Sequence, residues 1–299
     1  MGRYAVKKIE YLFKKIRCLF VSDFRYRKFH FMQKFGYQPD MLHPKSFNEK
    51  IMYRMLQPCD IRYTVMSNKL FAREIVSELI GDKFLVPLLG VWDTVRDIPL
   101  NDLPNCFVLK CNHDCGSTII VNDKKTHDFS ATFQKLRFHL KRNMYYVSRE
   151  RQYQNISPKI MCEEYLDFSN TQYKGFTSDV WRVHCFDGTP RFLEVEYISN
   201  TGSRHSGIYD PEWRRLPLEM GYPGIAEDYP APQTLSEMLC AAVILSSNFD
   251  YCRIDFYLCG DSNVYFSEFT FSPSNGREEF TPQEWDFVFG RHWDLTQKP

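Results

Sequence analysis

The chain has 299 residues, of which 43% are hydrophobic and 25% charged, and these proportions are ordinary for a soluble globular protein. Its net charge of +1 excludes a global field that would attract nucleic acid, so any anion binding must be local. The sequence contains no apolar run of the roughly 18 residues that a membrane-spanning helix needs.

The ten cysteines are scattered along the chain, and several lie in apolar stretches where cysteine packs as a small hydrophobe. Met1 to Phe20 lacks the uninterrupted apolar stretch of a signal peptide. We therefore expect reduced thiols and a cytoplasmic location. Aromatic residues make up 16% of the chain, which fits a Phe-rich core better than a sugar-stacking surface.

Residues 5–20 predict a basic amphipathic helix, with apolar residues at helical spacing and lysines elsewhere on its surface. Two interpretations stay open. The helix either packs on its own domain, which is the favoured reading, or makes peripheral contact with an anionic membrane surface, such as the inner membrane face.

Hydrophobic periodicity and turn residues predict the remaining elements in chain order. They are a short helix after Pro44–Lys50, a helix from an N-cap at Ser67 to Gly81, strands at 84–92, 106–111 and 117–121, a helix at 129–143, strands at 159–166, 180–186 and 191–198, a Gly/Ser/Arg-rich loop at 200–207, a helix at 234–247, two hairpin strands at 251–258 and 264–271, and a helix near 282–289. Strands outnumber helices and hairpins are frequent, so the predicted class is α+β.

The hairpin strands carry the strongest chemical signal. By the period-two rule, Arg253 and Asp255 share one face of the first strand, and Glu268 and Thr270 share one face of the second. Carboxylates and a guanidinium that point the same way need a compensating partner when buried. Mg²⁺ with the phosphates of a nucleotide would provide one.

Lys110 ends a predicted strand and precedes a turn, Cys111–Thr118, that contains glycine and small hydroxyl residues. Such a turn can offer backbone N–H groups to phosphate, with the lysine as a point charge. No Walker A or GxGxxG motif is present. A zinc site built from the nearby cysteines and His113 is the weaker alternative, because the spacing fits no usual zinc pattern. A plain hairpin turn also remains open.

Three further groups of residues could bind ligands. Lys69 begins a helix, where a cation gains little from the helix dipole but would suit a phosphate; taken alone, a solvated surface lysine is the favoured alternative. Glu163 and Glu164 lie in an apolar strand, as in an edge segment that hydrogen-bonds adenine, although solvent-facing charges are an alternative. Arg182 and His184 share a strand face, and Arg204–His205 and Arg214–Arg215 add cations that could bind a carboxylate or an acyl phosphate. Solvated surface is the alternative for two of these three clusters.

The order of these motifs resembles the ATP-grasp superfamily and, more narrowly, the TupA-like (teichuronopeptide biosynthesis) ATP-grasp proteins of polysaccharide gene clusters. The resemblance covers roughly residues 40–295. The segments that carry it are Ser46–Lys50, Asn68–Lys69 with Arg73, Val86–Trp92, Lys110–His113, Arg253–Tyr257 and Ser267–Pro273.

The resemblance implies an ATP-grasp fold, in which two α+β subdomains sandwich ATP, preceded by a short helical N-terminal region. The implied division is an N-terminal helical region at 1–58 and an ATP-grasp domain at 59–299. Within this domain, about 84–166 would be the lid or nucleotide-binding subdomain and about 177–299 the catalytic, metal-binding subdomain.

The resemblance also implies roles for individual residues. The cofactor-binding residues would be Lys69, Lys110, His113, Gly116 and Ser117 at the phosphates and Glu163, Glu164, Tyr165 and Leu166 at the adenine. The Mg²⁺ ligands would be Asp255, Glu268 and Thr270, where many ATP-grasp ligases have Asn in place of the threonine. The catalytic residues would be Arg253, Lys110 and Arg182, and the substrate contacts Arg204, His205 and Asn275.

The implied activity is an ATP-dependent carboxylate–amine ligase that forms an amide through an acyl phosphate. The carboxylate would belong to a uronic acid of a bacterial capsular or O-antigen polysaccharide precursor. Two alternatives are a glycosyltransferase or carbohydrate-binding protein of the same pathway and an ATP-grasp fold that binds without catalysis. The sequence contains no Asp-x-Asp after a strand, which disfavours a nucleotide-sugar transferase.

Overall fold

The computed structural model describes residues 3–168, 172–173, 175–178, 180–226, 229–260 and 263–295. The chain forms two compact units, each assembled from separate segments. Unit 1 contains residues 1–27, 58–72 and 86–166, and unit 2 contains residues 28–57, 73–85 and 167–299. The predicted N-terminal region therefore contributes to both units. Each unit combines helices with an antiparallel sheet, which confirms the α+β class.

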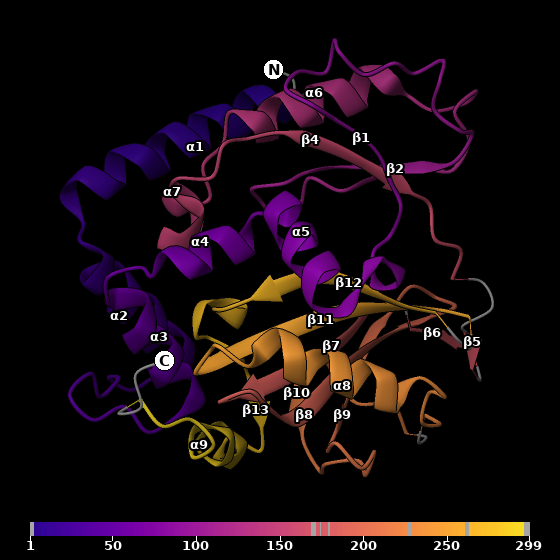
Figure 1. Ribbon diagram of the computed structural model, residues 1–299. Helices are drawn as coiled ribbons and strands as arrows, with labels where there is room; N and C mark the ends of the chain where they lie inside the picture. The colour runs from indigo at the N-terminus through magenta and orange to yellow at the C-terminus, as the bar shows by residue number, and fades with distance from the viewer. Residues whose placement is uncertain are drawn as a thin grey trace. The chain divides into compact units, whose positions relative to one another are not determined.

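Figure 1 labels the elements. In unit 1 these are α1 (Arg3–Phe20), α4 (Ile61–Ser67), β1 (Leu88–Trp92), β2 (Phe107–Cys111), β3 (Ile119–Val121), α6 (Phe129–Leu140), α7 (Tyr145–Ser148), the 3₁₀ helix η2 (Arg151–Tyr153) and β4 (Ile160–Glu164). Two of the boundaries between the units fall inside helices, namely α2 (Asp23–Phe35) and α5 (Lys69–Ile80).

The sheet of unit 1 has the strand order β1-β4-β2-β3, with each neighbouring pair antiparallel. Phe107, Leu109 and Cys111 of β2 are fully buried in a hydrophobic cluster that includes Leu136 of α6. Because side chains alternate along a strand, Lys110 points to the opposite face of the sheet. This alternation explains how an apolar strand presents one lysine away from its core.

Unit 2 contains the larger set of elements. They are α3 (Phe47–Leu56), the 3₁₀ helix η1 (Asp82–Phe84), β5 (Gln172–Tyr173), β6 (Phe176–Thr177), β7 (Val180–Phe186), β8 (Thr189–Ser199), β9 (Arg204–Tyr209), β10 (Glu219–Met220), α8 (Leu235–Ser246), β11 (Tyr251–Cys259), β12 (Asn263–Thr270), the 3₁₀ helix η4 (Pro273–Asn275), β13 (Phe280–Thr281) and α9 (Glu284–Gly290).

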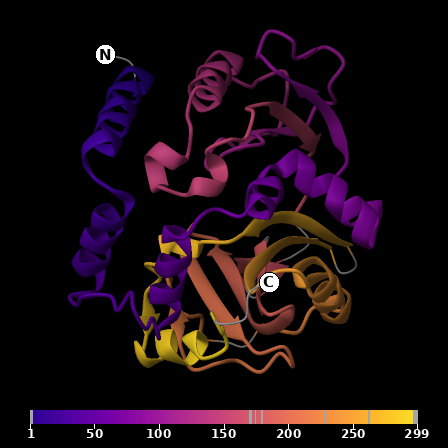
Figure 2. The ribbon, with the colours of Figure 1, turned by 60° about the vertical axis from the view of Figure 1, so that its left-hand side comes forward.

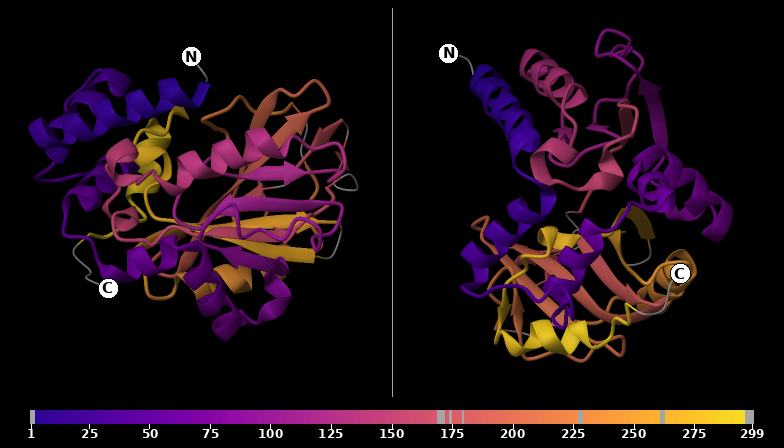
Figure 3. Two further views of the ribbon diagram at one scale, coloured as in Figure 1. Left: turned by 90° about the horizontal axis from the view of Figure 1, so that it is seen from above. Right: turned by 90° about the vertical axis from the view of Figure 1, so that its left-hand side faces the viewer.

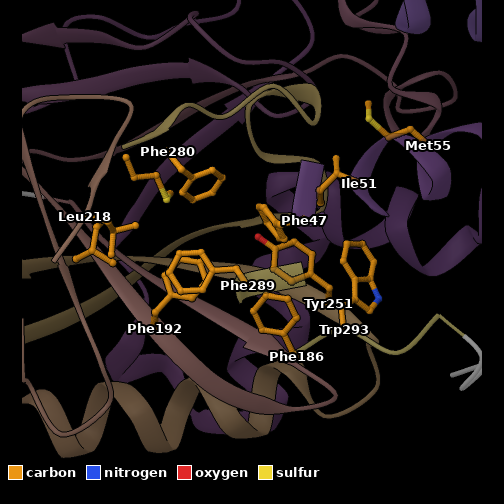
Figure 4. Packing of buried hydrophobic residues seen from close by; sticks show 12 residues of the cluster. Phe47, Ile51, Met55, Phe186, Phe192, Leu218, Tyr251, Phe280, Phe289 and Trp293 are labelled. Atoms are coloured by element: carbon orange, nitrogen blue, oxygen red, sulfur yellow. The ribbon is translucent and has the colours of Figure 1, made fainter. Parts of the chain in front are cut away.

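The main sheet of unit 2 runs in the order β12-β11-β7-β8-β6-β5, and β9 pairs with β8. Helix α8 packs on strands β7, β8 and β11, and Figures 2 and 3 show the sheet between α8 and α9. On the side away from α8, an aromatic cluster joins Phe186, Phe192 and Tyr251 to α3 and α9, as Figure 4 shows. Further along the same strands, this face becomes charged.

Most predicted elements are present, with shifted ends. Helix α3 begins at the capping box of Ser46 and Glu49, as the polar linker suggested. The predicted cap at Ser67 is wrong, because Ser67 ends α4 and the side chain of Asn68 accepts from the N–H of Leu70 at 3.1 Å. Helix α2 was not predicted. Two residues of the predicted hairpin turn, Asp261 and Ser262, lie outside the described residues.

The predicted loop at 200–207 is wrong in its second half, because Arg204–Tyr209 forms strand β9. Close packing of side chains explains why residue 207 is a glycine. A Cβ on Gly207 would lie 2.8 Å from Cε2 of Tyr209 and 2.9 Å from Cε2 of Tyr197, so aromatic rings fill the space of a side chain. Glycine therefore marks close packing in this strand and not a turn.

Candidate functional site

In unit 1 the predicted phosphate-binding lysine forms a buried ion pair. Lys110 Nζ lies 2.5 Å from Oε2 of Glu163, and both side chains are less than 10% exposed. The register of β2 and β4 sets Val108 opposite Glu163 and Lys110 opposite Met161. The pair is therefore a diagonal contact on the sheet face that points away from the core cluster. The structure thus joins two predicted site residues that are 53 positions apart in sequence.

Strand β4 is not the edge strand that its acidic residues suggested. It lies between β1 and β2, and the N–H of Glu164 donates to the carbonyl of Pro87 at 3.0 Å. The sheet therefore uses the backbone of Ile160–Glu164. Tyr165 and Leu166 follow the strand, and Tyr165 is 38% exposed. Any backbone contact with adenine would fall to these two residues.

The turn after Lys110 is held by α6 and the residues that follow it. His113 is buried, and its Nε2 lies 3.2 Å from the carbonyl oxygen of His139 and 3.0 Å from that of Arg142. Asp114 is also buried, with Oδ2 at 2.5 Å from Nδ1 of His139 and 3.0 Å from Nη2 of Arg142. Burial lowers the pKa of His113, so its imidazole is neutral at pH 7.

Two predicted residues of this turn differ in their surroundings. Ser117 is buried, and its hydroxyl accepts from the N–H of Cys111 at 2.9 Å. Gly116 has φ +81°, and a Cβ there would meet no heavy atom within 4 Å. The turn is therefore fixed on its inner side by Ser117 and open at Gly116, where glycine is needed for its conformation.

Lys69 lies beside the same turn. Its N–H donates to the carbonyl of Asn112 at 3.0 Å, and Nζ donates to the carbonyl of Asp114 at 3.2 Å. The buried Asn112 amide donates to Oδ1 of Asn68 at 2.9 Å and accepts from the N–H of Lys159 at 2.7 Å. These contacts connect the start of α5 to the turn that follows Lys110, so the two predicted lysines belong to one connected part of unit 1.

In unit 2 the charged residues form a row across the strands. The register pairs Glu268 with Asp255, Asp255 with Arg182, and Arg182 with Glu194. A second row pairs Thr270 with Arg253 and Arg253 with His184. Directly paired residues project from the same side of an antiparallel sheet. The two predicted catalytic arginines and the predicted metal-binding residues therefore share the face opposite α8, whereas the third predicted catalytic residue, Lys110, lies in unit 1.

Arg253 forms a bidentate ion pair with Asp255. Nε and Nη2 of Arg253 each donate to one carboxylate oxygen at 2.7 Å, and Nη2 lies 3.3 Å from Oγ1 of Thr270. Burial raises the pKa of Asp255 in spite of this guanidinium, and the Glu268 carboxylate adds to the rise. A cation near both carboxylates would favour their ionised form.

Arg182 bridges two acids that the sequence reasoning missed. Its Nη1 donates to Oε1 of Glu194 at 2.6 Å, and its Nη2 donates to Oε2 of Glu196 at 2.7 Å. Burial by itself would raise the pKa of Glu194, but Arg182 first, then His184 and Arg253, lower it to about 2. The signal was present in the sequence, because alternating glutamates in the apolar stretch 191–198 share one strand face.

Two more groups belong to this environment. Burial lowers the pKa of His184 to about 4, so this fully buried imidazole is neutral at pH 7 while its Nδ1 lies 3.0 Å from the hydroxyl of Tyr251. Burial and the negative charge of Glu194 raise the pKa of Glu278, whose carboxylate accepts from the hydroxyl of Ser274. Glu278 lies in an irregular segment, where no periodicity could have marked it.

The predicted substrate residues are not all brought together. Arg204 donates to Glu196 and is 53% exposed on the charged face. His205 lies on the opposite face of β9, because it pairs with Tyr197. The centroid of its ring lies 5.4 Å from that of the Phe176 ring. Asn275 has φ +57°, and its buried Oδ1 has no hydrogen-bond partner among the described residues. Arg204 is thus the one of the three that joins the charged network.

The donor set fits Mg²⁺ when a nucleotide supplies further oxygens. Within the described ranges, no group of three His, Cys, Asp or Glu side chains is placed to hold a metal ion. Asp255 and Glu268 are directly paired carboxylates, and their mutual repulsion contributes to the raised pKa of Asp255. Mg²⁺ is commonly held by one or two carboxylates together with phosphate oxygens and water.

Comparisons with known proteins give the family of the chain. A family model described as TupA-like ATP-grasp matches residues 49–293. The chain is similar to the L-amino acid ligase from Bacillus licheniformis, with 13% sequence identity over 74% of this chain and 47% of that chain and a TM-score of 0.43. It is similar to the D-alanine-D-alanine ligase from Coxiella burnetii, with 11% identity over 69% of this chain and 47% of that chain and a TM-score of 0.37. It is also similar to the D-cycloserine synthetase DcsG, with 12% identity over 78% of this chain and 70% of that chain and a TM-score of 0.39. The chain spans about half the length of the first two. No curated protein sequence matches it.

Proposed function

Because the chain belongs to the TupA-like ATP-grasp family, we propose that it is an ATP-dependent ligase that joins a carboxylate to an amine. The observation that carries the proposal is the charged face of unit 2. There Arg253 is ion-paired with Asp255, and Glu268 is paired opposite Asp255 on the next strand. Acids in excess of arginines on a largely buried face suit a divalent cation and the anionic group that accompanies it.

The residues of unit 1 would bind the nucleotide. Lys69 and Lys110 would contact phosphate oxygens, and Lys110 would leave Glu163 or share its charge between the two partners. The open backbone around Gly116 would approach the phosphates, since no side chain occupies that space. Tyr165 and Leu166 would offer backbone groups to the adenine, because the sheet already uses the backbone of β4.

The residues of unit 2 would stabilise the reacting groups. Asp255 and Glu268, with Thr270 beside them, would hold Mg²⁺, which supplies charge neutralisation at the transferring phosphoryl group. Arg253 and Arg182 would stabilise negative charge that develops on the carboxylate and phosphoryl oxygens. Their positions are fixed by Asp255, Glu194 and Glu196, so little reorganisation is needed during the reaction.

The reaction proposed has two steps. A carboxylate oxygen attacks the γ-phosphorus of ATP, which forms an acyl phosphate and releases ADP. The amine nitrogen then attacks the carbonyl carbon, phosphate leaves with the C–O bonding pair, and the nitrogen loses a proton to give the amide. The carboxylate class we propose is a uronic acid of a capsular or O-antigen polysaccharide precursor. Support for this class comes from the resemblance to TupA-like proteins and from the exposed Arg204 on the charged face.

The test is ADP formation by the purified protein with panels of uronic acids and amines. We expect ADP only when ATP, Mg²⁺, a carboxylate and an amine are all present. Asp255→Asn should lower the rate about 100-fold or more. The matched control is Asp102→Asn at an exposed acid of unit 1, which should keep the rate. ADP formation by Asp255→Asn at the wild-type rate, or stabilisation by UDP-sugars and not by ATP–Mg²⁺ in thermal melts, would contradict the proposal.

A further inference from the structure

Helix α1 presents an apolar surface to solvent. Its exposed apolar residues lie at helical spacing and include Leu12 (56% exposed), Phe13 (65%), Leu19 (79%) and Phe20 (78%). Val6, Ile9 and Ile16 belong to the same surface and are each more than 40% exposed. We refer to these seven residues as the α1 stripe. An exposed apolar surface of this kind usually marks an interaction site.

The opposite side of α1 packs on the rest of unit 1. Figure 1 shows α1 beside α6 and α7. The ring of Tyr4 packs on that of Phe138, with 5.7 Å between the ring centroids. The hydroxyl of Tyr11 accepts a hydrogen bond from the N–H of Asn143 at 2.8 Å. Lys15 lies over the ring of Tyr146 at 5.2 Å. The helix is thus attached through tyrosines and a lysine, and the more hydrophobic side faces outward.

Basic residues occupy much of the α1 surface outside the α1 stripe. Between residues 5 and 17 the helix carries Lys7, Lys8, Lys14, Lys15 and Arg17 against one acid, Glu10. The whole chain has a net charge of only +1, so this positive charge is concentrated locally. A continuous apolar side, with lysines on the remaining surface, is the pattern of helices that lie in the interface of an anionic membrane.

We propose that α1 docks the protein on an anionic membrane surface, with the α1 stripe inserted among the lipids and the lysines at the headgroups. No helix of the described residues is long and apolar enough to cross a membrane, so the helix would lie in the plane of the interface. A second copy of the chain is the less suitable occupant, because two such helices would bring the same positive charges together.

The full chain is tested by sedimentation with two kinds of vesicle, phosphatidylcholine alone and phosphatidylcholine with about one-third phosphatidylglycerol. We expect binding to the anionic vesicles, weakened by added salt, and little binding to the neutral ones. Phe13→Ser combined with Leu19→Ser should lower the partition coefficient about 10-fold or more. Lys8→Gln combined with Lys14→Gln should lower it about five-fold for each lysine on anionic vesicles.

The matched control is Leu42→Ser combined with Ile61→Ser, because both residues are highly exposed and neither lies on α1. This variant should bind like the wild type. All variants change exposed or half-exposed side chains, so their thermal unfolding should match that of the wild type. Equal binding by Phe13→Ser/Leu19→Ser and the wild type would overturn the proposal. The proposal would also be overturned if the wild type did not bind vesicles and instead formed a dimer that Phe13→Ser combined with Leu19→Ser dissociates.

Discussion

The two units hold their charged residues in different ways. In unit 1, Lys110 pairs with Glu163 across two neighbouring strands, and the turn beside them is fixed by hydrogen bonds to α6 and the residues after it. In unit 2, the charges extend over strands β7, β8, β9, β11 and β12, where Arg182, Arg204 and Arg253 accompany four acids, Glu194, Glu196, Asp255 and Glu268.

This difference matches two kinds of ligand. A lysine beside a glutamate can exchange its partner for a phosphate oxygen without a large change in local charge. A network with more carboxylates than guanidiniums keeps a negative balance, which a divalent cation can neutralise. The comparison predicts that the network of unit 2 is more sensitive to loss of one member than the pair of unit 1.

Loss of Arg182 should have the largest effect on stability. Arg182→Met leaves Glu194 and Glu196 buried without their shared guanidinium, so the free energy of unfolding should fall by about 3–5 kcal/mol. Chemical denaturation of the full chain measures this fall. The control is Arg214→Met, which removes ion pairs of a side chain that is 73% exposed and should change stability little. Equal effects of the two variants would contradict the network.

The pair of unit 1 should behave differently. Lys110→Met leaves Glu163 buried without the lysine and should lower the free energy of unfolding by about 3 kcal/mol. Adding Glu163→Gln should recover most of this loss, because no buried charge then remains. ADP formation should stay low in both variants, since neither has the lysine. A double variant that is as unstable as Lys110→Met would show that the pair is not the source of the effect.

A substitution at Asp114 tests how the turn after Lys110 is held against α6 and the residues that follow α6. Asp114→Asn should lower the free energy of unfolding by about 1–3 kcal/mol at neutral pH, because His139 and Arg142 lose a buried carboxylate. Burial would raise the pKa of Asp114, but His139, Ser117 and Arg142 lower it overall. Its contribution is therefore full above the pKa of an unfolded aspartate and is lost as pH falls through the lower, folded pKa.

The difference in stability between the wild type and Asp114→Asn should thus shrink as the solution is acidified. Denaturation at a series of pH values measures it, with Asp102→Asn as the exposed control that should match the wild type at each pH. A difference that stays constant down to acid pH would contradict the assigned role of the carboxylate.

Gly116→Ala should have the smallest effect on stability, about 1 kcal/mol, since its φ is positive and the space around it is open. Gly36→Ala is a close control, because Gly36 has φ +74° and equally open surroundings. The two variants should lose similar stability, but only Gly116→Ala should weaken ATP binding in calorimetry. Equal ATP affinity in both variants would remove the turn from the nucleotide site.

The sequence predicted the parts of the site that depend on local alternation. Arg253, Asp255, Glu268 and Thr270 could be placed on one face because two alternating runs flank a turn. The Lys110–Glu163 contact depends on the register of two strands that are distant in the chain, which no local pattern determines. Glu194 and Glu196 carried an alternation that could have been noticed, whereas Glu278 lies in irregular backbone and required the tertiary structure.

The same limit applies to the fold. Gly207 and the serines around it resembled a loop, but aromatic rings from neighbouring residues occupy the space beside the glycine in a strand. The acids of β4 suggested an edge strand, although pairing on both sides places it in the interior of its sheet. In both cases the amino-acid composition indicated that the segment has unusual surroundings, but it predicted the wrong structural cause. The cause lies in the cross-strand partners, which a local sequence pattern does not show.

The most direct test of the metal site on the charged face of unit 2 is calorimetric titration of ATP, with and without Mg²⁺, into the wild type, Asp255→Asn and the control Asp102→Asn. Mg²⁺ should strengthen ATP binding to the wild type and to the control, and Asp255→Asn should lose this dependence while its melting profile stays cooperative. An unchanged effect of Mg²⁺ on ATP binding by Asp255→Asn would contradict the assignment of the charged face of unit 2 as the metal site.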